Sequence, residues 1–301
     1  MREIIITIQE LKRKRRAVLL AHNYQLDDVQ AVADYVGDSF YLSKVAADVK
    51  SDVIVFCGVR FMAETAKLLA PDKEVLLPER DAGCPLAEMI TAEDVRRLKS
   101  EHPGTPVMCY VNSSVEVKAE SNVCCTSANA VKIAASLPGK KLIFVPDGNL
   151  GHYVASRVME KEFILWPGHC YTHAKIKPDD VLTVREKYRE AKVLIHPECD
   201  PEVARLADFT GSTSQIMHYA EKSSAPAFII GTEVGVLYQL SAKQPDKKFY
   251  LLHPGLICPN MKKTRLESVL AALKDNKHSI TVEQAVAAKA RYTLDRMLEL
   301  A

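Results

Sequence analysis

One set of marks occurs three times along the chain at nearly constant spacing, and it limits the possible folds more than any other feature. Each copy has a polar or aromatic residue after a short apolar run, a serine or threonine 17 residues later, and a lysine 34 residues after that. The marks are, copy by copy, His22, Ser39 and Lys73; Tyr110, Ser127 and Lys161; His196, Thr213 and Lys247.

The length of the repeat indicates what kind of unit is repeated. The copies begin 88 and then 86 residues apart, which is too long for a solenoid repeat and suits a small domain. We therefore expect three homologous domains, at residues 1–104, 105–190 and 191–301.

A cysteine follows the lysine of each copy, in a loop that contains proline or glycine. The interval from lysine to cysteine is 11, 9 and 11 residues, so the only change of length falls in this loop. These cysteines are Cys84, Cys170 and Cys258, and their repetition favours a functional role. Buried core cysteines are common, and five others lie in or beside apolar runs and are predicted to be core residues: Cys57, Cys109, Cys124, Cys125 and Cys199.

Short apolar segments alternate with helical segments in every copy. In the first copy we expect strands at 17–21, 53–56 and 74–77 and a helix near 28–35, and the order returns in the other two copies, with a helix at 127–136 in the second. Strict alternation predicts parallel sheets with helices on both faces. The expected fold class is α/β, with three three-layer αβα domains in a pseudo-threefold arrangement. A last amphipathic helix, 282–300, is expected to pack the end of the chain against its start.

The composition excludes several classes of protein. The chain of 301 residues is 48% hydrophobic and 26% charged with a net charge of +2, which is ordinary for a globular protein and gives no argument for nucleic-acid binding. No segment resembles a signal peptide or reaches the roughly 18 to 20 apolar residues of a membrane span. We therefore expect a cytoplasmic protein, whose cysteines are metal ligands, catalytic groups or core residues rather than disulfides.

The repeated marks lie where a parallel sheet places its ligands, beyond the carboxyl ends of the strands. Three polar tripeptides follow the first strands of the copies, and a hydroxyl-bearing residue then begins a helix, where free N–H groups and the helix dipole favour anions. The tripeptides are His22-Asn23-Tyr24, Tyr110-Val111-Asn112 and His196-Pro197-Glu198, and the hydroxyl-bearing residues are Ser39, Ser127, Ser212 and Thr213.

Three cysteines that meet at one centre predict a metal site with a free coordination position. A closed zinc site or electron-transfer cluster uses four protein ligands, whereas three leave room for a substrate or water at an iron that acts as a Lewis acid. The histidines without counterparts in the other copies are predicted to lie on the surface or to make local hydrogen bonds: His152, His169, His173, His218 and His278.

The ordered set of segments GDS, CTSANA, PDGNLG, HPEC and GST, with the tripeptides and the three cysteines, resembles quinolinate synthase over essentially the whole chain. The resemblance implies three related αβα domains around a [4Fe–4S] cluster that is bound by one cysteine per domain. It also implies condensation of iminosuccinate with dihydroxyacetone phosphate to give quinolinate, phosphate and water. The cluster ligands would be Cys84, Cys170 and Cys258.

Such a reaction loses two waters and moves protons on carbon, so it requires acid and base groups. Glu198, Tyr24, Tyr110 and His196 are available, and we expect Glu198 to be the principal base, with Tyr24 and Tyr110 as acids or relays. Some relatives carry a C-x-x-C-P segment that can form a disulfide. That segment is absent here, because Cys258 is followed by Pro259, Asn260 and Met261, with Met261 at the place of the second cysteine. The substrate-contacting residues would be His22, Ser39, Tyr110, Val111, Asn112, Ser127, His196, Pro197, Glu198, Ser212 and Thr213.

Two other functions fit part of the pattern. One is an iron–sulfur hydro-lyase or condensing enzyme that acts on a different small acid. The other is a non-catalytic electron carrier, which would need neither the polar tripeptides nor the helix-start hydroxyls. If the chain is a quinolinate synthase, the expected partners are iminosuccinate, dihydroxyacetone phosphate and an L-aspartate oxidase or dehydrogenase that supplies the imine. No nucleic acid and no membrane are expected as partners.

Overall fold

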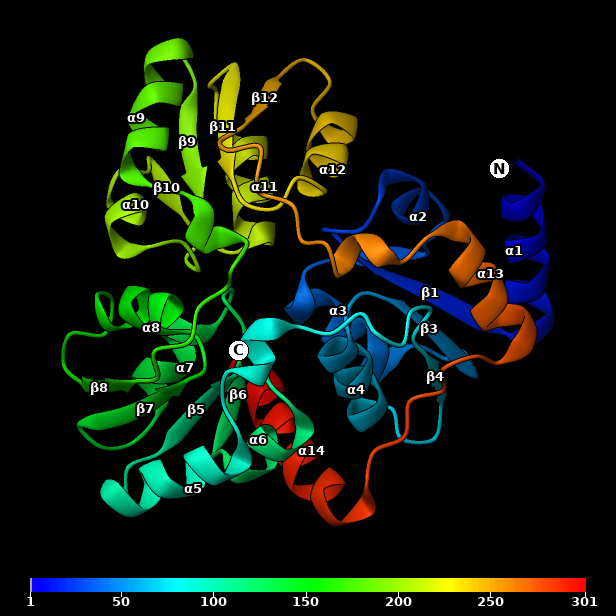
Figure 1. The fold of residues 1–301 in the computed structure, drawn as a ribbon, viewed down its shortest axis with the longest axis horizontal. Helices are drawn as coiled ribbons and strands as arrows, with labels where there is room; N and C mark the ends of the chain where they lie inside the picture. Colours follow the sequence, from blue (N-terminus) through cyan, green and yellow to red (C-terminus); the bar gives the residue numbers. More distant parts are fainter. Residues whose placement is uncertain (1) are drawn as a thin grey trace.

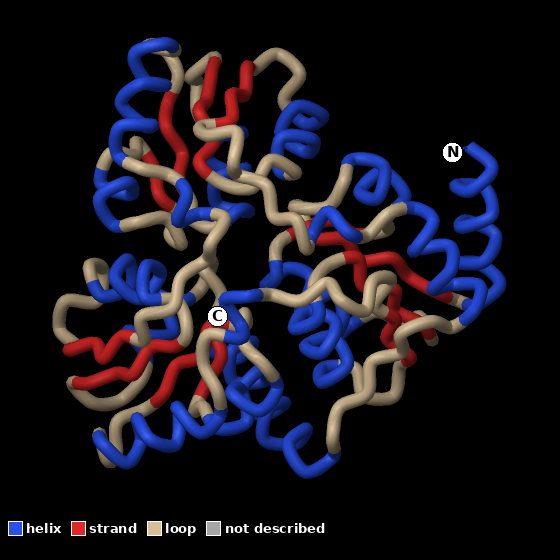
Figure 2. The backbone as a smooth tube through the Cα atoms, in the orientation of Figure 1, coloured by secondary structure: helices blue, strands red, loops and turns tan. Residues whose placement is uncertain are grey.

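Three parallel four-stranded sheets form the framework of the computed structural model, which describes residues 2–301 (Figure 1). The strand orders are β2-β1-β3-β4, β6-β5-β7-β8 and β10-β9-β11-β12, so all three sheets have one topology. Helices flank each sheet, as Figure 2 shows. The α/β fold class and the three related units predicted from the repeat are confirmed. A sheet and the helices that cover it are called a lobe here, numbered from the N-terminus.

The elements follow one another in strict alternation. The first repeat comprises α1 (Arg2–Arg15), β1 (Ala17–His22), α2 (Asp27–Val32), β2 (Tyr35–Gly37), α3 (Ser39–Asp48), β3 (Val53–Cys57), α4 (Arg60–Leu69), β4 (Glu74–Leu76) and α5 (Ala92–Glu101). The second comprises β5 (Val107–Tyr110), α6 (Val115–Glu120), β6 (Val123–Cys125), α7 (Ala130–Ser136), β7 (Lys141–Val145), α8 (Gly148–Ala155), β8 (Glu162–Leu165) and α9 (Pro178–Lys187). The third comprises β9 (Lys192–Ile195), α10 (Pro201–Arg205), β10 (Phe209–Thr210), α11 (Thr213–Lys222), β11 (Ala227–Gly231), α12 (Val236–Lys243), β12 (Lys248–Leu251) and α13 (Leu266–Asp275), and α14 (Gln284–Leu300) follows.

One strand of each sheet was not predicted. Strands β2, β6 and β10 are only two or three residues long, and such short segments show no hydrophobic period. The helix expected near 28–35 ends at Val32 because the chain enters β2. The helix expected at 127–136 begins only at Ala130, because Thr126 and Asn129 form a turn in which the Asn129 side chain accepts from the Thr126 N–H.

The central strands are buried on both faces. Every residue of β3 and β11 is buried, as the parallel arrangement predicts. One apolar core joins the first two lobes and extends to Ala290, Leu294 and Met297 of α14. The third lobe has separate cores on the two faces of its sheet.

The helix that ends each repeat packs on the next lobe. Helix α5 contacts α6, α9 contacts α10, and α13 contacts α1 and β3. The three crossings close a ring, so the chain interlocks its lobes (Figure 1). Helix α14 packs mainly on α6 and β6 of the second lobe and on α4. The expectation that α14 would pack against the start of the chain is therefore wrong. Helix α13 packs against α1 instead, and α14 packs against the edge strand β6.

Within residues 2–301, the helices are all too short or too polar to cross a lipid bilayer.

Candidate active site

The carboxyl ends of the strands from all three lobes surround one pocket. Cys84, Cys170 and Cys258 all line it, and none of the three forms a disulfide. The other predicted site residues in its wall are His22, Tyr24, Ser39, Tyr110, Asn112, Ser127, His196, Glu198 and Thr213.

Three predicted substrate contacts lie outside the pocket wall. Val111 is buried in the core of the second lobe. Pro197 lines a separate groove between the second and third lobes. Ser212 caps α11 by accepting a hydrogen bond from the Gln215 N–H. Of the three, Ser212 has a side-chain hydrogen bond next to a pocket residue, since it caps the helix that Thr213 begins.

Each cysteine loop is held to the end of its central strand by one repeated backbone hydrogen bond. In each lobe, the residue that begins the next helix or turn donates its N–H to the carbonyl two residues before the cysteine. The pairs are Arg60 to Ala82 at 2.8 Å, Gly148 to Gly168 at 2.8 Å and Val234 to Leu256 at 2.9 Å. The loops therefore start from equivalent places in the three lobes, although the middle one is shorter.

The close approach in the second lobe requires glycine. A Cβ atom on Gly168 would lie 2.3 Å from the Pro146 carbonyl oxygen. Gly168→Ala is expected to reduce the free energy of unfolding by about 1–3 kcal/mol, because backbone must shift to relieve the clash. Gly83→Ala is the matched control, since its nearest neighbour is the end of the flexible Glu88 side chain at 3.2 Å. Urea unfolding measures both, and equal stabilities would contradict the assignment.

The backbone fixes the tautomers of His22 and His196. The Tyr24 N–H donates to Nδ1 of His22 at 3.1 Å, and the Glu198 N–H donates to Nδ1 of His196 at 3.3 Å. Nδ1 is therefore an acceptor in each neutral ring, and Nε2 carries the proton. The His196 Nε2 lies 3.2 Å from the Ser127 hydroxyl, on the pocket side. Both rings thus offer an N–H donor to an anionic ligand.

Burial keeps these two rings neutral. It lowers the pKa of His22 from 6.5 to about 3, with help from His196, and it lowers the pKa of His196 to about 3 although Glu198 opposes the shift. The unfolded chain therefore binds more protons than the folded chain between these values. Its free energy of unfolding should fall below pH 6.5, by up to about 1.4 kcal/mol per pH unit for each histidine.

Urea unfolding of the metal-free chain between pH 7 and pH 5 tests this acid sensitivity. The His22→Gln variant lacks one of the two groups, so its stability should depend less steeply on pH. Parallel curves for the parent and the variant would contradict the proposed cause.

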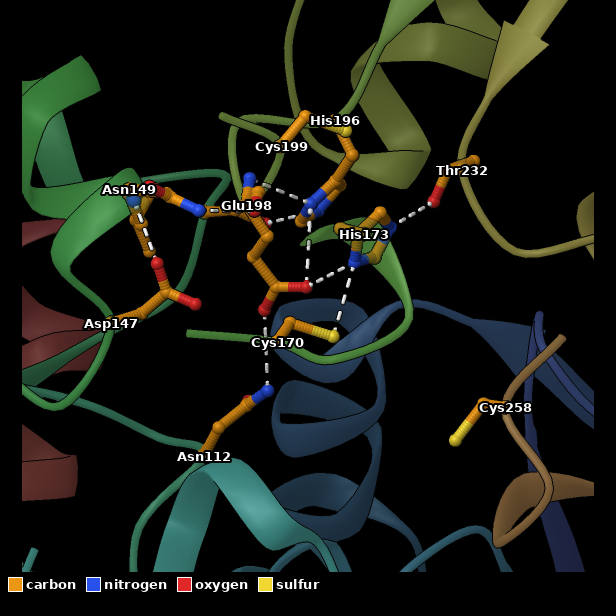
Figure 3. A network of polar contacts seen from close by, with 12 residues as sticks. Asn112, Asp147, Asn149, Cys170, His173, His196, Glu198, Cys199, Thr232 and Cys258 are labelled. Atoms are coloured by element: carbon orange, nitrogen blue, oxygen red, sulfur yellow. Dashed lines mark hydrogen bonds and ion pairs between the residues drawn. The ribbon is translucent and has the colours of Figure 1, made fainter. Parts of the chain in front are cut away.

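Glu198 is a buried acid of the pocket that has several polar partners. Its Oε2 lies 2.8 Å from His173 Nδ1 and 3.6 Å from His196 Nδ1, and Asn112 Nδ2 lies 3.4 Å from Oε1 (Figure 3). Burial alone would raise the pKa of Glu198, but the hydrogen bond from His173 and the neighbouring histidines lower it below the ordinary value. Glu198 is thus ionised in the free pocket.

A chain of polar groups connects Glu198 to Tyr24. The Tyr24 hydroxyl lies 2.7 Å from the Thr232 hydroxyl, which lies 3.0 Å from His173 Nε2. Tyr24 also meets Thr213, at 3.1 Å. Burial, followed by the charge of Glu198, raises the pKa of Tyr24 well above its ordinary value, so this phenol remains a proton donor. The same two causes raise the pKa of Tyr110.

His173 corrects the prediction that the unmatched histidines are surface or local residues. It is buried, its Nδ1 lies 3.2 Å from Cys170 Sγ, and its ring stacks on His196 with centroids 4.8 Å apart. The repeat could not reveal it, because the residues three positions after Cys84 and Cys258 are the apolar Ala87 and Met261. The sequence feature that could have indicated a role in the site was the position of His173, three residues after Cys170.

Two further buried acids were missed although they repeat. Asp147 and Glu233 each lie 37 residues after the first mark of their copies, Tyr110 and His196, at the ends of β7 and β11. The equivalent residue of the first copy is Val59, which hid the pattern. Glu233 lines the pocket.

The donor set suits a soft metal centre. Thiolate sulfur prefers iron–sulfur clusters, zinc and Cu(I) over hard cations, and three thiols from three lobes line one pocket. Burial raises the pKa of Cys84 to about 12 and that of Cys170 well above its ordinary value, so thiolates there need a cation to balance them. The residues therefore fit an iron–sulfur cluster. Cys170, His173 and Glu198 also bring one possible ligand atom each within 4.8 Å of one another.

These features define a class: a three-lobed α/β protein with one pocket that is lined by three single thiols, a buried acid, two neutral histidines and two phenols. Comparison with known families agrees with this class. The family model described as quinolinate synthetase A protein matches residues 6–299. The chain belongs to this family.

Curated relatives lead to the same family. The chain is 59% identical to the quinolinate synthase of Caldicellulosiruptor saccharolyticus over 97% of both chains. It is 54% identical to that of Alkaliphilus metalliredigens and 52% identical to that of Geobacter metallireducens, with at least 96% of each chain covered. These matches support quinolinate synthase activity for this chain.

Proposed function

We propose that this chain condenses iminosuccinate with dihydroxyacetone phosphate to give quinolinate, phosphate and two waters. The family match over residues 6–299 carries the proposal, and the contents of the pocket support it. Cys84, Cys170 and Cys258 would hold a [4Fe–4S] cluster whose fourth iron, free of protein ligands, would serve as a Lewis acid for substrate oxygen atoms.

The chain's own donors suit the anionic substrates. Iminosuccinate brings two carboxylates and the triose brings a phosphate. Ser39 and Thr213 are the first residues of α3 and α11, where unpaired backbone N–H groups and the helix dipole favour negative charge. The Nε2–H groups of His22 and His196 add neutral donors, so anion binding would not require protonated histidine. Ser127 and Asn112 complete the polar wall.

Proton transfer would be divided between a base and two acids. Glu198 would take protons from carbon, because it is ionised, buried and oriented by His173 and Asn112. Tyr24 and Tyr110 would donate to departing oxygens, because both phenols keep their protons. The path from Glu198 through His173 and Thr232 would carry those protons back to Tyr24. The enclosed pocket would exclude water from these steps.

Product analysis under anaerobic conditions tests the proposal. Purified protein loaded with iron and sulfide, supplied with iminosuccinate and dihydroxyacetone phosphate, should release quinolinate and phosphate in equal amounts. Dihydroxyacetone without phosphate is the control, and it should give no product at a comparable rate. Iron-loaded protein that makes no quinolinate would favour a different small acid as substrate, the competing interpretation of the same site.

Two further parts of the proposal concern the setting of the enzyme. Iminosuccinate hydrolyses readily, so an L-aspartate oxidase or dehydrogenase that produces it would be the natural partner. A cytoplasmic location, and the domain boundaries at residues 104 and 190, stay predictions.

A further inference from the structure

We propose that Asp147 and Glu233 are positioning residues that set the loops of two cluster cysteines, Cys170 and Cys258. The inference rests on the proposed cluster ligands. It concerns residues that the acid and base steps above do not use.

Glu233 has the clearer geometry. Its Oε1 accepts a hydrogen bond from the Cys258 N–H at 3.1 Å, and its Oε2 accepts one from the Gly235 N–H at 2.7 Å. The side chain is fully buried, and its charge is balanced by Lys262 Nζ at 3.0 Å. One carboxylate therefore holds both the cysteine itself and the turn that leaves β11.

Lys262 extends this contact to the first lobe. Its ammonium group donates to the Tyr24 carbonyl at 2.6 Å, while it pairs with Glu233. Its own N–H donates to the Cys258 carbonyl at 3.2 Å. Glu233 and Lys262 thus fix the Cys258 loop against the tripeptide that carries Tyr24, and a shift of one would move the other.

Asp147 has the equivalent place in the second lobe. Its Oδ1 accepts from the Leu150 N–H at 2.8 Å and so caps α8. Asp147 also forms a bridge with Gly168, two residues before Cys170, and its side chain is fully buried. This cap fixes the first turn of α8, whose Gly148 N–H holds the Gly168 carbonyl at 2.8 Å, so the Asp147 side chain sets the Cys170 loop through that turn.

The first lobe shows what the backbone provides without the acid. Val59 occupies the equivalent position, and only the bond from the Arg60 N–H to the Ala82 carbonyl ties that loop to β3. The acid is therefore an addition to a shared backbone contact in two of the three lobes. Groups that orient a metal ligand from behind typically contribute about 10–100-fold to metal affinity.

Variants at Glu233 form a graded series. Gln keeps one acceptor for two N–H donors, and Val copies the first lobe and keeps none. We expect iron to be removed by a chelator from reconstituted Glu233→Gln and Glu233→Val about 10–100-fold faster than from the parent, with Val the faster. Asp147→Val, which also copies the first lobe and removes the cap of α8, should behave like Glu233→Val. Should the Val variants fail to fold, Glu233→Gln still decides the outcome.

The matched control is Asp208→Asn. Asp208 also accepts a backbone N–H, from Val193 at 2.8 Å, and also pairs with a cation, Arg185, but it lies away from the cysteine loops. Asn122 has the same role toward Val107 in the second copy, so the amide is tolerated there. The Asp208→Asn protein should lose iron at the parent rate.

Amide hydrogen exchange of the metal-free chain separates this inference from the cluster assignment. Exchange should rise at Cys258 in the Glu233 variants and at Cys170 in Asp147→Val, and should be unchanged at Cys84. Unchanged exchange at these loops, or iron loss at the parent rate, would overturn the positioning role. A parent that never binds iron would contradict the ligand assignment instead, and exchange alone would then decide whether the acids hold the loops.

Discussion

Glu198→Gln is expected to reduce kcat by at least about 100-fold, because a positioned general base typically contributes about 10² to 10⁴-fold. The amide keeps the shape of the side chain and can still accept a hydrogen bond from His173. It cannot take a proton from carbon. Iron content and the visible spectrum should stay at parent values, since Glu198 is not among the proposed ligands.

The control for this experiment is Glu162→Gln. Glu162 begins β8 and pairs with Lys141 at the surface, so its substitution should leave turnover unchanged. A Glu198→Gln enzyme with nearly the parent rate and an intact cluster would remove Glu198 from the base role. Tyr110 would then be the next residue to test, because it is a phenol of the same pocket whose pKa is raised by burial and by the charge of Glu198.

Replacement of any one of Cys84, Cys170 and Cys258 by serine should have the largest effect of all. A hydroxyl is a hard and weakly acidic donor, and it replaces a soft thiolate poorly at iron. Each variant should lose most of its iron together with the brown absorbance, and activity should fall by at least about 100-fold because the cluster's Lewis acid is lost.

A cysteine outside the pocket serves as the control. Cys57 is buried at the end of β3 and does not line the pocket, so Cys57→Ala should keep its iron. Unchanged iron after substitution of Cys84 would show that fewer thiols, or a set that includes Cys170, His173 and Glu198, hold the metal.

The repeat predicted the framework because spacing survives where side chains change. Equal intervals placed Cys84, Cys170 and Cys258 at equivalent strand ends, and the structure brings all three to one pocket. The same reasoning found His22 and His196. It could not find β2, β6 and β10, since a strand of two or three residues leaves no periodic pattern.

The residues that the sequence did not reveal are those that only one or two copies possess. His173 reaches Glu198 because the Cys170 loop turns back into the pocket, and no counterpart marks it. Asp147 and Glu233 repeat, but Val59 breaks the series in the first copy. Roles of this kind depend on contacts between lobes, which spacing within a copy does not record.

The exchange of α5, α9 and α13 between neighbouring lobes limits what can be cut from this chain. A fragment that ends at its own last helix would carry that helix without its sheet and leave its own sheet partly uncovered. The smallest part of the molecule that buries all of its apolar faces is thus the ring of all three lobes. Any hinge between two lobes must bend at the short segments that join Cys84, Cys170 and Cys258 to α5, α9 and α13, the helices that pack on the next lobe.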